Sequence, residues 1–498
     1  MSANKNILYL ISALEGFIIM GVEITGAKLL APFFGNSLYV WASVISITML
    51  GLAVGYFAGA KLIKAQKNVL KILKYAVFVN ALWLLILPFL LNRIYLFLMY
   101  HPVNFYLSLF VIAAMVLFVS VSILGLVSPV IIQLLNKSEA RAGIYAGTIF
   151  ALSTFTGIVA TLLFGFWFIP SFGLKISCLL LSALHVVIFL LLLKDKKEWI
   201  FFLIWMLFVA GFLYKMKQRS SYVLYQKEGI DGQITVFEYP TECFGTLREL
   251  TVNQITQSIW TESGDYVLDY VNLIYNLTDT IKAKENENAL VLGMGGGTLA
   301  NMLADKNYRV DAIEFDIRII EAAKNYLNLN PLVNVVNDDA RHFINTLALR
   351  EKKYSIVVID VFKGEVSPGY VLTQESLALL KNSLTPNARV IINTHGYLDK
   401  TIGKGNLALL HTLKKSGFYV SVHSTGNLPE YRNLEIFSTL TPEVNINSSI
   451  QYSQTDIILT DDKQQLEQLN AQANLNWRKG YMAQLMKEHQ KLNPDIFL

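Results

Sequence analysis

The sequence predicts a polytopic α-helical membrane domain, followed by a small β-domain and a doubly wound α/β domain. The 498 residues are too many for one ordinary domain. The mean hydropathy of +0.43 indicates that part of the chain lies in a membrane. Apolar blocks fill residues 7–214, whereas the chain from residue 220 onward has the composition of a soluble protein. We therefore expect domains at residues 1–219, 220–264 and 265–498.

The first part contains a series of apolar segments, most of which are long enough to cross a bilayer. These segments are residues 7–30, 38–60, 72–91, 104–134, 143–168, 173–193 and 199–214. The last segment is short for a full crossing, so an interfacial position is the alternative for it.

Basic residues gather in alternate loops between these segments. They are Lys61, Lys64, Lys67, Lys71, Lys74, Lys137, Arg141, Lys194, Lys196 and Lys197. The positive-inside rule places these loops in the cytoplasm, and we expect a multi-pass protein of the cell (inner) membrane with a cytoplasmic soluble part. Seven full spans would put the soluble part outside. Either 199–214 does not cross, or another segment crosses twice.

Two features of the apolar segments go beyond hydropathy. Gly51, Gly55 and Gly59 recur every four residues, which predicts the close approach of another helix. Glu15 and Glu23 lie inside the first segment, where carboxylates are costly. They either pair with a neighbouring helix or bind a cationic or polar substrate.

The second part begins with strand-like alternation in "GQITVFEY", "LRELTV" and "NQITQSIW", which predicts a small antiparallel sheet. A helix is expected at about 265–280. From residue 289 strands alternate with helices, and the strands read "ALVLGM", "RVDAIEFD", "VNVVNDDA", "YSIVVIDVF" and "ARVIINTHG". This alternation predicts a doubly wound parallel sheet whose ligand binds at the carboxyl ends of the strands.

A glycine-rich loop follows the first strand of this sheet, and an acid ends the second. Gly293, Gly295 and Gly297 would let a ligand approach the backbone and a helix N-terminus. Glu314 lies about 20 residues further on, where a carboxylate can accept hydrogen bonds from a ribose diol. These residues fit either NAD or S-adenosylmethionine.

Acids at the ends of the third and fourth strands separate these two ligands. Asp338 and Asp339 end the third strand, where a carboxylate can accept a hydrogen bond from an adenine amino group. Asp360 ends the fourth strand, at the mouth of the expected site. The sequence shows no second phosphate site, so an adenosyl sulfonium fits better than a dinucleotide.

The cysteines, the net charge and the histidines argue against a disulfide framework, a nucleic-acid partner and a metal site. Cys178 and Cys243 lie far apart and predict no disulfide framework. The net charge of +5 comes without a dense basic tract, so we expect no nucleic-acid partner. The seven histidines show no metal-ligand spacing, and we expect no metal site. His342 and His395 flank the expected crevice and are interpreted as surface or supporting residues.

Residues 222–440 resemble the polyamine aminopropyltransferases, the spermidine synthase family. The small β-domain before the glycine loop and the order of the motifs carry this resemblance. The whole chain resembles membrane-fused spermidine synthase-like proteins. In the apolar part the shared motifs are "GLAVGYFAGAKL", "GLVSPVIIQLL" and "AGIYAGTIFALSTFTGIVATLLFGF", and in the soluble part they are "GMGGGTLA", "NDDARHF", "IDVFKGEVSPGYVLTQE" and "LTDD". The resemblance implies a Rossmann-like domain of the class I methyltransferase type. It also implies decarboxylated S-adenosylmethionine or S-adenosylmethionine as co-substrate, a small-molecule amine as acceptor, and a homodimer at the lipid bilayer.

The resemblance also implies roles for individual residues. Gln257 would contact the methionine-derived part of the cofactor. Glu314 would bind the ribose hydroxyls, and Asp339 would bind the adenine. Gly293, Gly295 and Gly297 would form the loop. Asp360 would act as general base or orient the attacking amine, because an amine must lose a proton before it attacks. The implied substrate contacts are Asp269, Tyr270, Glu365 and Tyr370.

Three positions depart from the family's usual pattern. Gly296 replaces an aspartate in the glycine loop, and Lys363 replaces an aspartate three residues after the catalytic one. The motif before the loop, "LDYVNL", also differs. Losing two carboxylates weakens selection for a diamine, unless Glu365, Asp461 or Asp462 substitutes for them.

Three hypotheses therefore stay open. The first is aminopropyl transfer from decarboxylated S-adenosylmethionine in spermidine synthesis. The second is transfer of a methyl or aminocarboxypropyl group from S-adenosylmethionine, which Gly296 and Lys363 favour. The third is a transporter or sensor whose soluble domain binds an adenosyl ligand without turnover, with Glu15 and Glu23 carrying the function.

Overall fold

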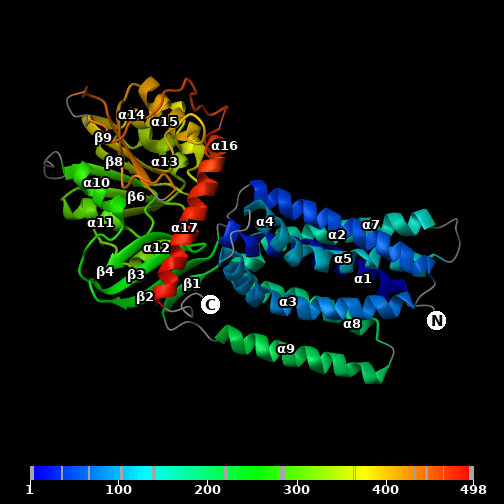
Figure 1. Cartoon of the computed structure of the whole chain (residues 1–498). Helices are drawn as coiled ribbons and strands as arrows, with labels where there is room; N and C mark the ends of the chain where they lie inside the picture. Colours follow the sequence, from blue (N-terminus) through cyan, green and yellow to red (C-terminus); the bar gives the residue numbers. More distant parts are fainter. Residues whose placement is uncertain are drawn as a thin grey trace. The chain divides into compact units, whose positions relative to one another are not determined.

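The computed structural model forms two compact units, which are described separately. The first comprises residues 1–219 and 227–233, and the second residues 220–226 and 234–498. The described residues are 5–34, 38–65, 68–100, 105–136, 142–193, 195–217, 222–229, 232–279, 287–362, 364, 366–430, 432–442, 447–463 and 465–492. Figure 1 shows the order of elements along the chain. The small sheet lies in the same unit as the larger one, and its separation as residues 220–264 remains a prediction.

The first unit is helical, as predicted. Its helices are α1 (Lys5–Phe34), α2 (Leu38–Lys64), α3 (Val69–Tyr100), α4 (Phe105–Ala113), α5 (Val119–Gly125), α6 (Val127–Leu135), α7 (Ala142–Leu163), α8 (Ile169–Leu191) and α9 (Trp199–Lys217). Short π-helical turns, Ala114–Phe118 and Phe164–Phe168, join α4 to α5 and α7 to α8. The described residues contain six helical stretches long and apolar enough to cross a membrane.

The six stretches account for all seven predicted segments to within two residues at their ends, because two of the segments lie in one stretch. Residues Ala142–Leu191 form a continuous run of 50 residues. A helix of that length extends about 75 Å, more than twice a hydrocarbon core of about 30 Å. Gly173 breaks the run with non-helical backbone angles (φ 79°, ψ 173°), at the start of the second predicted segment. The last predicted segment, 199–214, is also helical and belongs to a stretch of its own.

The glycines at four-residue spacing pack against another helix, which confirms that prediction. A Cβ placed on Gly55 would lie 2.5 Å from the carbonyl oxygen of Ser122 and 2.8 Å from the Cα of Gly125. The backbones of α2 and α5 therefore approach too closely for any side chain. Glu15 is fully buried, and its carboxylate accepts a hydrogen bond from Ser128 Oγ at 2.8 Å. This is the structural pairing predicted as one of its two alternatives.

The second unit contains two sheets. The smaller is antiparallel with the order β1-β2-β3-β4, formed by β1 (Val223–Lys227), β2 (Ile234–Thr241), β3 (Gly245–Val252) and β4 (Ile255–Thr261). The strands β2, β3 and β4 were predicted, whereas β1 was not. The predicted helix at 265–280 is α10 (Asp269–Asp279).

The larger sheet has seven strands in the order β10-β11-β9-β8-β5-β6-β7. They are β5 (Asn288–Leu292), β6 (Arg309–Glu314), β7 (Asn334–Asn337), β8 (Tyr354–Ile359), β9 (Leu384–His395), β10 (Tyr419–Ser424) and β11 (Asn433–Thr439). The five predicted strands, β5 to β9, are parallel, and β11 pairs antiparallel with both β9 and β10. This is the predicted Rossmann-like fold of the methyltransferase type, extended by two strands that the sequence did not predict.

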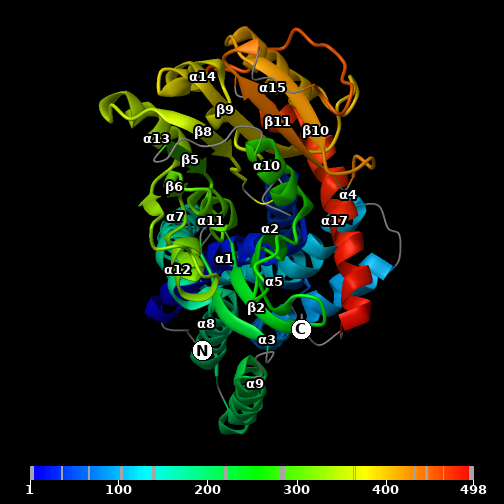
Figure 2. The ribbon, with the colours of Figure 1, turned by 90° about the vertical axis from the view of Figure 1, so that its left-hand side faces the viewer.

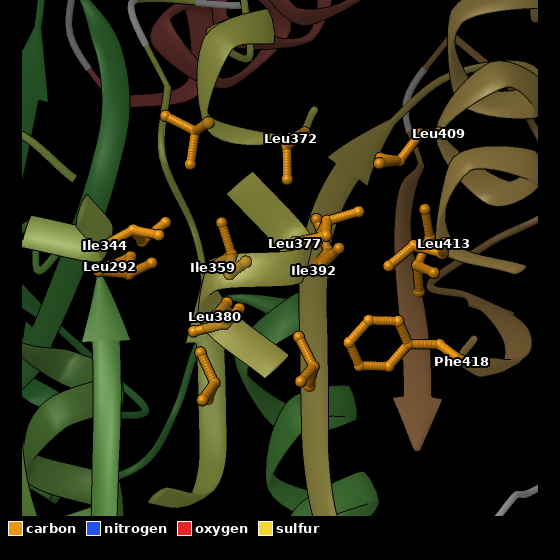
Figure 3. Close-up of a cluster of buried hydrophobic side chains, with 14 of the residues drawn as sticks. Leu292, Ile344, Ile359, Leu372, Leu377, Leu380, Ile392, Leu409, Leu413 and Phe418 are labelled. Carbon is orange, nitrogen blue, oxygen red and sulfur yellow. The ribbon is translucent and has the colours of Figure 1, made fainter. Parts of the chain in front are cut away.

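Helices cover both faces of the larger sheet. One face packs against α10, α11 (Thr298–Asp305) and α12 (Ile317–Tyr326). The other packs against α13 (Ala340–Thr346), α14 (Gln374–Lys381) and α15 (Lys404–Lys415). Figure 3 shows part of this second core, where Leu292, Ile359 and Ile392 of three strands lie among leucines of the covering helices. Burial on both faces explains why these strands are nearly continuous apolar runs.

The chain ends in α16 (Leu466–Leu469) and the long helix α17 (Ala471–Leu492). Figure 2 shows α17 extending from the larger sheet towards the smaller one. Side-chain contacts support this path, because Trp477 stacks on His395 of β9 and Tyr481 hydrogen-bonds to Thr256 of β4. The helix therefore contacts both sheets of the second unit.

Candidate active site

The glycine-rich loop joins the end of β5 to the start of α11. Gly293, Gly295 and Gly297 all have positive φ angles, of 85°, 53° and 89°. Such angles strain any residue with a side chain. A Cβ on Gly293 would lie 2.2 Å from the carbonyl oxygen of Asp360, so the loop touches the backbone at the end of β8. The loop therefore depends on glycine for both its conformation and its packing.

Hydrogen bonds hold the loop against both sheets. The amide of Gly295 donates to Glu314 Oε2 at 3.1 Å, and the amide of Gly296 donates to Ser258 Oγ at 2.8 Å. A Cβ on Gly296 would lie 2.6 Å from Ser258 Cβ and 2.7 Å from Leu327 Cδ1. An aspartate at position 296 would therefore require these neighbours to move.

Glu314 ends β6 and is 9% exposed. Besides Gly295, its carboxylate accepts a hydrogen bond from the amide of Asp316 at 3.0 Å. Burial raises the pKa of Glu314 to about 7, although the backbone hydrogen bonds oppose the shift. The structure thus joins the predicted ribose acid directly to the predicted loop.

The carboxylate of Asp339 accepts three hydrogen bonds and caps a helix. Its Oδ1 accepts from the backbone amides of Arg341 and His342, as the N-cap of α13. Its Oδ2 accepts from the hydroxyl of Tyr370 at 3.0 Å. The structure therefore brings together two of the predicted residues, Asp339 and Tyr370. A carboxylate has about four acceptor positions, so this arrangement leaves capacity for an adenine amino group.

Asp360 lies directly after β8, where its amide donates to Leu292 O at 2.8 Å. Its Oδ1 accepts from Asn393 Nδ2 at 2.8 Å, and it also hydrogen-bonds to Tyr270. Burial raises the pKa of Asp360 to about 6, and these two hydrogen bonds oppose the shift. The hydroxyl of Tyr270 lies 3.5 Å from the carbonyl oxygen of Gln257. Three predicted residues, Gln257, Tyr270 and Asp360, therefore meet at one place.

A row of stacked aromatic rings lies beside Asp360. Phe362 stacks on His395 with ring centroids 5.9 Å apart, and His395 stacks on Trp477 at 4.7 Å. Trp477 in turn stacks on Tyr481 at 5.1 Å. His395 is buried and belongs to this row, whereas His342 is exposed and bonds to Asp338 at 2.7 Å.

The other predicted acids lie apart from Asp360 or outside the described residues. Asp269 is exposed in the first turn of α10, where the helix dipole favours a carboxylate. Asp461 accepts hydrogen bonds from Arg341 and Thr373, at 2.6 Å each. Lys363 and Glu365 are not among the described residues. In the described ranges no group of three or more His, Cys, Asp or Glu side chains is placed to hold a metal ion.

Glu435 of β11 pairs with Asn393 of β9, beside Asp360. The residues around this site that were not predicted from the sequence are Ser258, Asn393, Glu435, Trp477 and Tyr481. Asn393 and Glu435 interrupt the apolar strands "RVIINTHG" and "NLEIFSTL". A polar residue in a strand that is otherwise apolar is a signal that could have identified both. Ser258, Trp477 and Tyr481 carry no such signal, because their importance depends on tertiary contacts.

Comparison with known proteins supports the resemblance. No family model matches the chain. Polyamine aminopropyltransferase 2 of Aquifex aeolicus is 24% identical over 427 residues, which are 81% of this chain and 82% of that protein. Polyamine aminopropyltransferase of Vibrio vulnificus is 24% identical over 179 residues, and the match covers 35% of this chain and 60% of that protein.

A solved structure of spermidine synthase from Thermotoga maritima is also similar, at 15% identity and a TM-score of 0.36. It covers 50% of this chain and 88% of that one. The sequence similarity to the Aquifex protein extends through most of both chains, so it includes part of the apolar helical unit. The chain is therefore similar to the polyamine aminopropyltransferases, and a region of membrane-type helices precedes its α/β domain in the sequence.

Proposed function

We propose that the chain transfers an aminopropyl group from decarboxylated S-adenosylmethionine to an amine. The observation that carries this proposal is the convergence of the glycine loop, Glu314 and Asp360 at the carboxyl ends of β5, β6 and β8. Ligands of doubly wound sheets bind at that edge. The two aminopropyltransferases that resemble the chain support the choice of reaction.

The loop and Glu314 form the adenosyl end of the proposed site. The positive φ angles of Gly293, Gly295 and Gly297 expose backbone that side chains would otherwise cover. Glu314 keeps acceptor capacity for a ribose hydroxyl, since four acceptor positions serve three amide donors, those of Gly295, Phe315 and Asp316. Asp339 would contact the adenine, and Gln257 the methionine-derived chain. When bound, the co-substrate supplies an activated carbon next to a sulfonium.

Asp360 and its neighbours form the acceptor end. The attacking amine is protonated in neutral water, and the Asp360 carboxylate takes its proton. The amine nitrogen then forms a bond to carbon while the carbon–sulfur bond breaks, and methylthioadenosine leaves. Asn393 and Tyr270 hold the carboxylate in one orientation, which positions the amine for in-line attack. Asp360 finally gives up the proton to solvent.

The glycine at position 296 and the lysine at position 363 of the sequence support the alternative, methyl or aminocarboxypropyl transfer from intact S-adenosylmethionine. The packing around Gly296 leaves no room for the acid that the family usually has in this loop. We nevertheless favour aminopropyl transfer, because the acceptor end keeps Asp360 and Tyr270 in contact. A domain that binds an adenosyl ligand without turnover is the third alternative.

The location of the reaction follows from the membrane-type helices. We infer that the α/β domain faces the cytoplasm, because the loops rich in lysine should lie there and the co-substrate is a cytoplasmic metabolite. The acceptor is then a cytoplasmic amine or one delivered through the helical unit. A homodimer remains part of the proposal.

A product assay tests the proposed function. The full chain, purified in detergent, is incubated with either co-substrate and a set of amines, and the released nucleoside is identified by mass spectrometry. We expect methylthioadenosine from decarboxylated S-adenosylmethionine, and no release by Asp360→Asn. Release of S-adenosylhomocysteine would establish methyl transfer instead. Methylthioadenosine from intact S-adenosylmethionine would establish aminocarboxypropyl transfer. Binding of methylthioadenosine without any product would favour the non-catalytic alternative.

A further inference from the structure

Glu435 is a buried acid that the proposed mechanism has not used. It lies in the middle of β11 and its exposed fraction is 0%. Neither of its carboxyl oxygens has a hydrogen-bond partner among the residues that the structure describes. Burying a polar group without a partner is costly, so such a group in a native protein calls for an explanation, such as a catalytic role or a bound water or ion.

Glu435 belongs to a row of polar residues that crosses three strands. Ile359 pairs with Ile392 between β8 and β9, so the next residues, Asp360 and Asn393, are neighbours. Asn393 pairs in turn with Glu435 of β11. Neighbours in such a row point to the same face of a sheet, and adjacent strands lie about 4.8 Å apart. Glu435 is therefore two strands from Asp360, about 10 Å between backbones.

Asn393 links the two acids by its own hydrogen bonds. It donates from Nδ2 to Asp360 and accepts at Oδ1 from Asn433 Nδ2 at 3.0 Å. The hydrogen bond that Asn393 Nδ2 donates goes to Asp360, and Glu435 accepts none from the described residues. The face on which these residues lie is the one that α10 covers, and α10 contributes Tyr270. Glu435 is consequently part of the acceptor end.

Two of the three acids considered earlier as substitutes have other partners. Asp461 hydrogen-bonds to Arg341 and Thr373, and Asp462 is exposed and accepts from Thr460 at 2.6 Å. Glu365 lies outside the described residues. Glu435 is the carboxyl group that the structure places in the row with Asp360.

We propose that Glu435 is the specificity residue for the acceptor, and that it binds the second ammonium group of a diamine whose first amine is deprotonated by Asp360. This inference rests on the proposed function and names its acceptor class. Two carboxylates separated by two strand spacings suit a short chain with a cation at each end. Glu435 would thus take over a role that the aspartates replaced at 296 and 363 no longer provide.

The charges around Glu435 predict that binding of a diamine releases a proton. Burial and the charge of Asp360 raise the pKa of Glu435 well above its usual range. Tyr270 from α10 and His423 from β10 also face this region, and burial lowers the pKa of His423, so it supplies no positive charge at neutral pH. Both effects favour the neutral form of the acid in the absence of ligand. An ammonium group beside it favours ionisation, so diamine binding should release a proton.

The test compares 1,4-diaminobutane with 1-aminobutane, which lacks the second ammonium. For each acceptor, kcat/KM is measured in the wild type, in Glu435→Gln and in Asp462→Asn, a control that removes an exposed carboxylate. We expect the preference for the diamine to fall about 10- to 100-fold in Glu435→Gln, the value of a charge-assisted contact. Asp462→Asn should keep the wild-type preference, and Glu435→Asp should retain part of it.

A binding titration decides the proposal even if the chain transfers no aminopropyl group. Binding of both amines to protein saturated with methylthioadenosine is measured by calorimetry in buffers of different ionisation enthalpy. The wild type should prefer the diamine and release protons when it binds, whereas Glu435→Gln should do neither. If Glu435→Gln lost affinity equally for both amines, or released protons as the wild type does, Glu435 would be only structural. Absence of transfer with these binding results intact would refute the proposed function alone.

Discussion

The two ends of the proposed pocket are constructed differently. The adenosyl end uses one short loop and one acid of the adjacent strand, joined by the hydrogen bond from Gly295 to Glu314. The acceptor end uses side chains from elements far apart in the chain, including Tyr270 of α10, Asn393 of β9 and Trp477 of α17. The first end is mainly backbone, and the second is mainly side chain.

This difference indicates where specificity can change. A backbone loop tolerates little change, because Gly293 has a positive φ and touches the carbonyl oxygen of Asp360. A side-chain surface can exchange one acid for another while the fold persists. We interpret the loss of acids at positions 296 and 363, together with Glu435 in β11, as such an exchange. The predictions below test whether the two ends act separately.

The largest expected effect comes from Asp360→Asn. This variant removes the base while it keeps the shape and the contact with Asn393, so kcat should fall about 10²- to 10⁴-fold. Methylthioadenosine affinity should stay near that of the wild type, because the adenosyl end is untouched. Steady-state kinetics and calorimetry measure the two quantities. Loss of nucleoside binding along with turnover would show that the two ends are not separate.

Gly293→Ala should damage both ends together. Its Cβ would lie 2.2 Å from the Asp360 carbonyl oxygen at a φ of 85°, so the loop and the end of β8 must shift. A displacement of about 1 Å at a reacting centre can cost about 100-fold in rate. Gly426→Ala is the matched control, because a Cβ there meets nothing within 4 Å. Near-normal turnover of Gly293→Ala would contradict the described loop geometry.

Glu314→Gln should affect the adenosyl end alone. We expect methylthioadenosine to bind about 10-fold more weakly, since a charged acceptor is replaced by a neutral one. Wild-type affinity should also fall as pH drops below 7, because the pKa of about 7 makes Glu314 protonated there. Glu467→Gln, which removes an exposed acid, serves as control. The ribose role fails if Glu314→Gln binds the nucleoside like the wild type.

The smallest expected effect is a pH dependence. Asp360 must be ionised to accept a proton, and its pKa is about 6. On the acidic side of the profile, the ionisation of Asp360 should therefore leave kcat/KM constant above about pH 7 and lower it about tenfold per pH unit below pH 6. A profile from pH 5 to 8, measured in wild type, checks this. An acidic limb centred near pH 4 would mean that Asp360 is more solvated during catalysis than in this structure.

The sequence predicted the adenosyl end better than the acceptor end for a physical reason. Gly293, Gly295, Gly297 and Glu314 follow consecutive strands, so their spacing alone indicates that they meet. The sequence also predicted β5 to β9 and the three main strands of the small sheet, because their apolar patterns are local. These parts depend on contacts between near neighbours in the chain.

The rest depends on contacts that no local pattern encodes. The row from Asp360 to Glu435 requires β11 to insert between β9 and β10, antiparallel to both. The aromatic row requires α17 to place Trp477 on His395. The resemblance at residues 222–440 ends before this helix. Asp269 was predicted beside Tyr270, but helical geometry turns adjacent residues to different sides, and Asp269 is exposed.

The most direct test of the central claim follows the aminopropyl group itself. Wild-type protein receives decarboxylated S-adenosylmethionine labelled with ¹³C in the aminopropyl chain, together with 1,4-diaminobutane, and all products are quantified by mass spectrometry. The account predicts one labelled spermidine for each methylthioadenosine released, and neither product from Asp360→Asn with bound nucleoside. Labelled spermidine from Asp360→Asn at the wild-type rate, or nucleoside release without any labelled amine from the wild type, would contradict it.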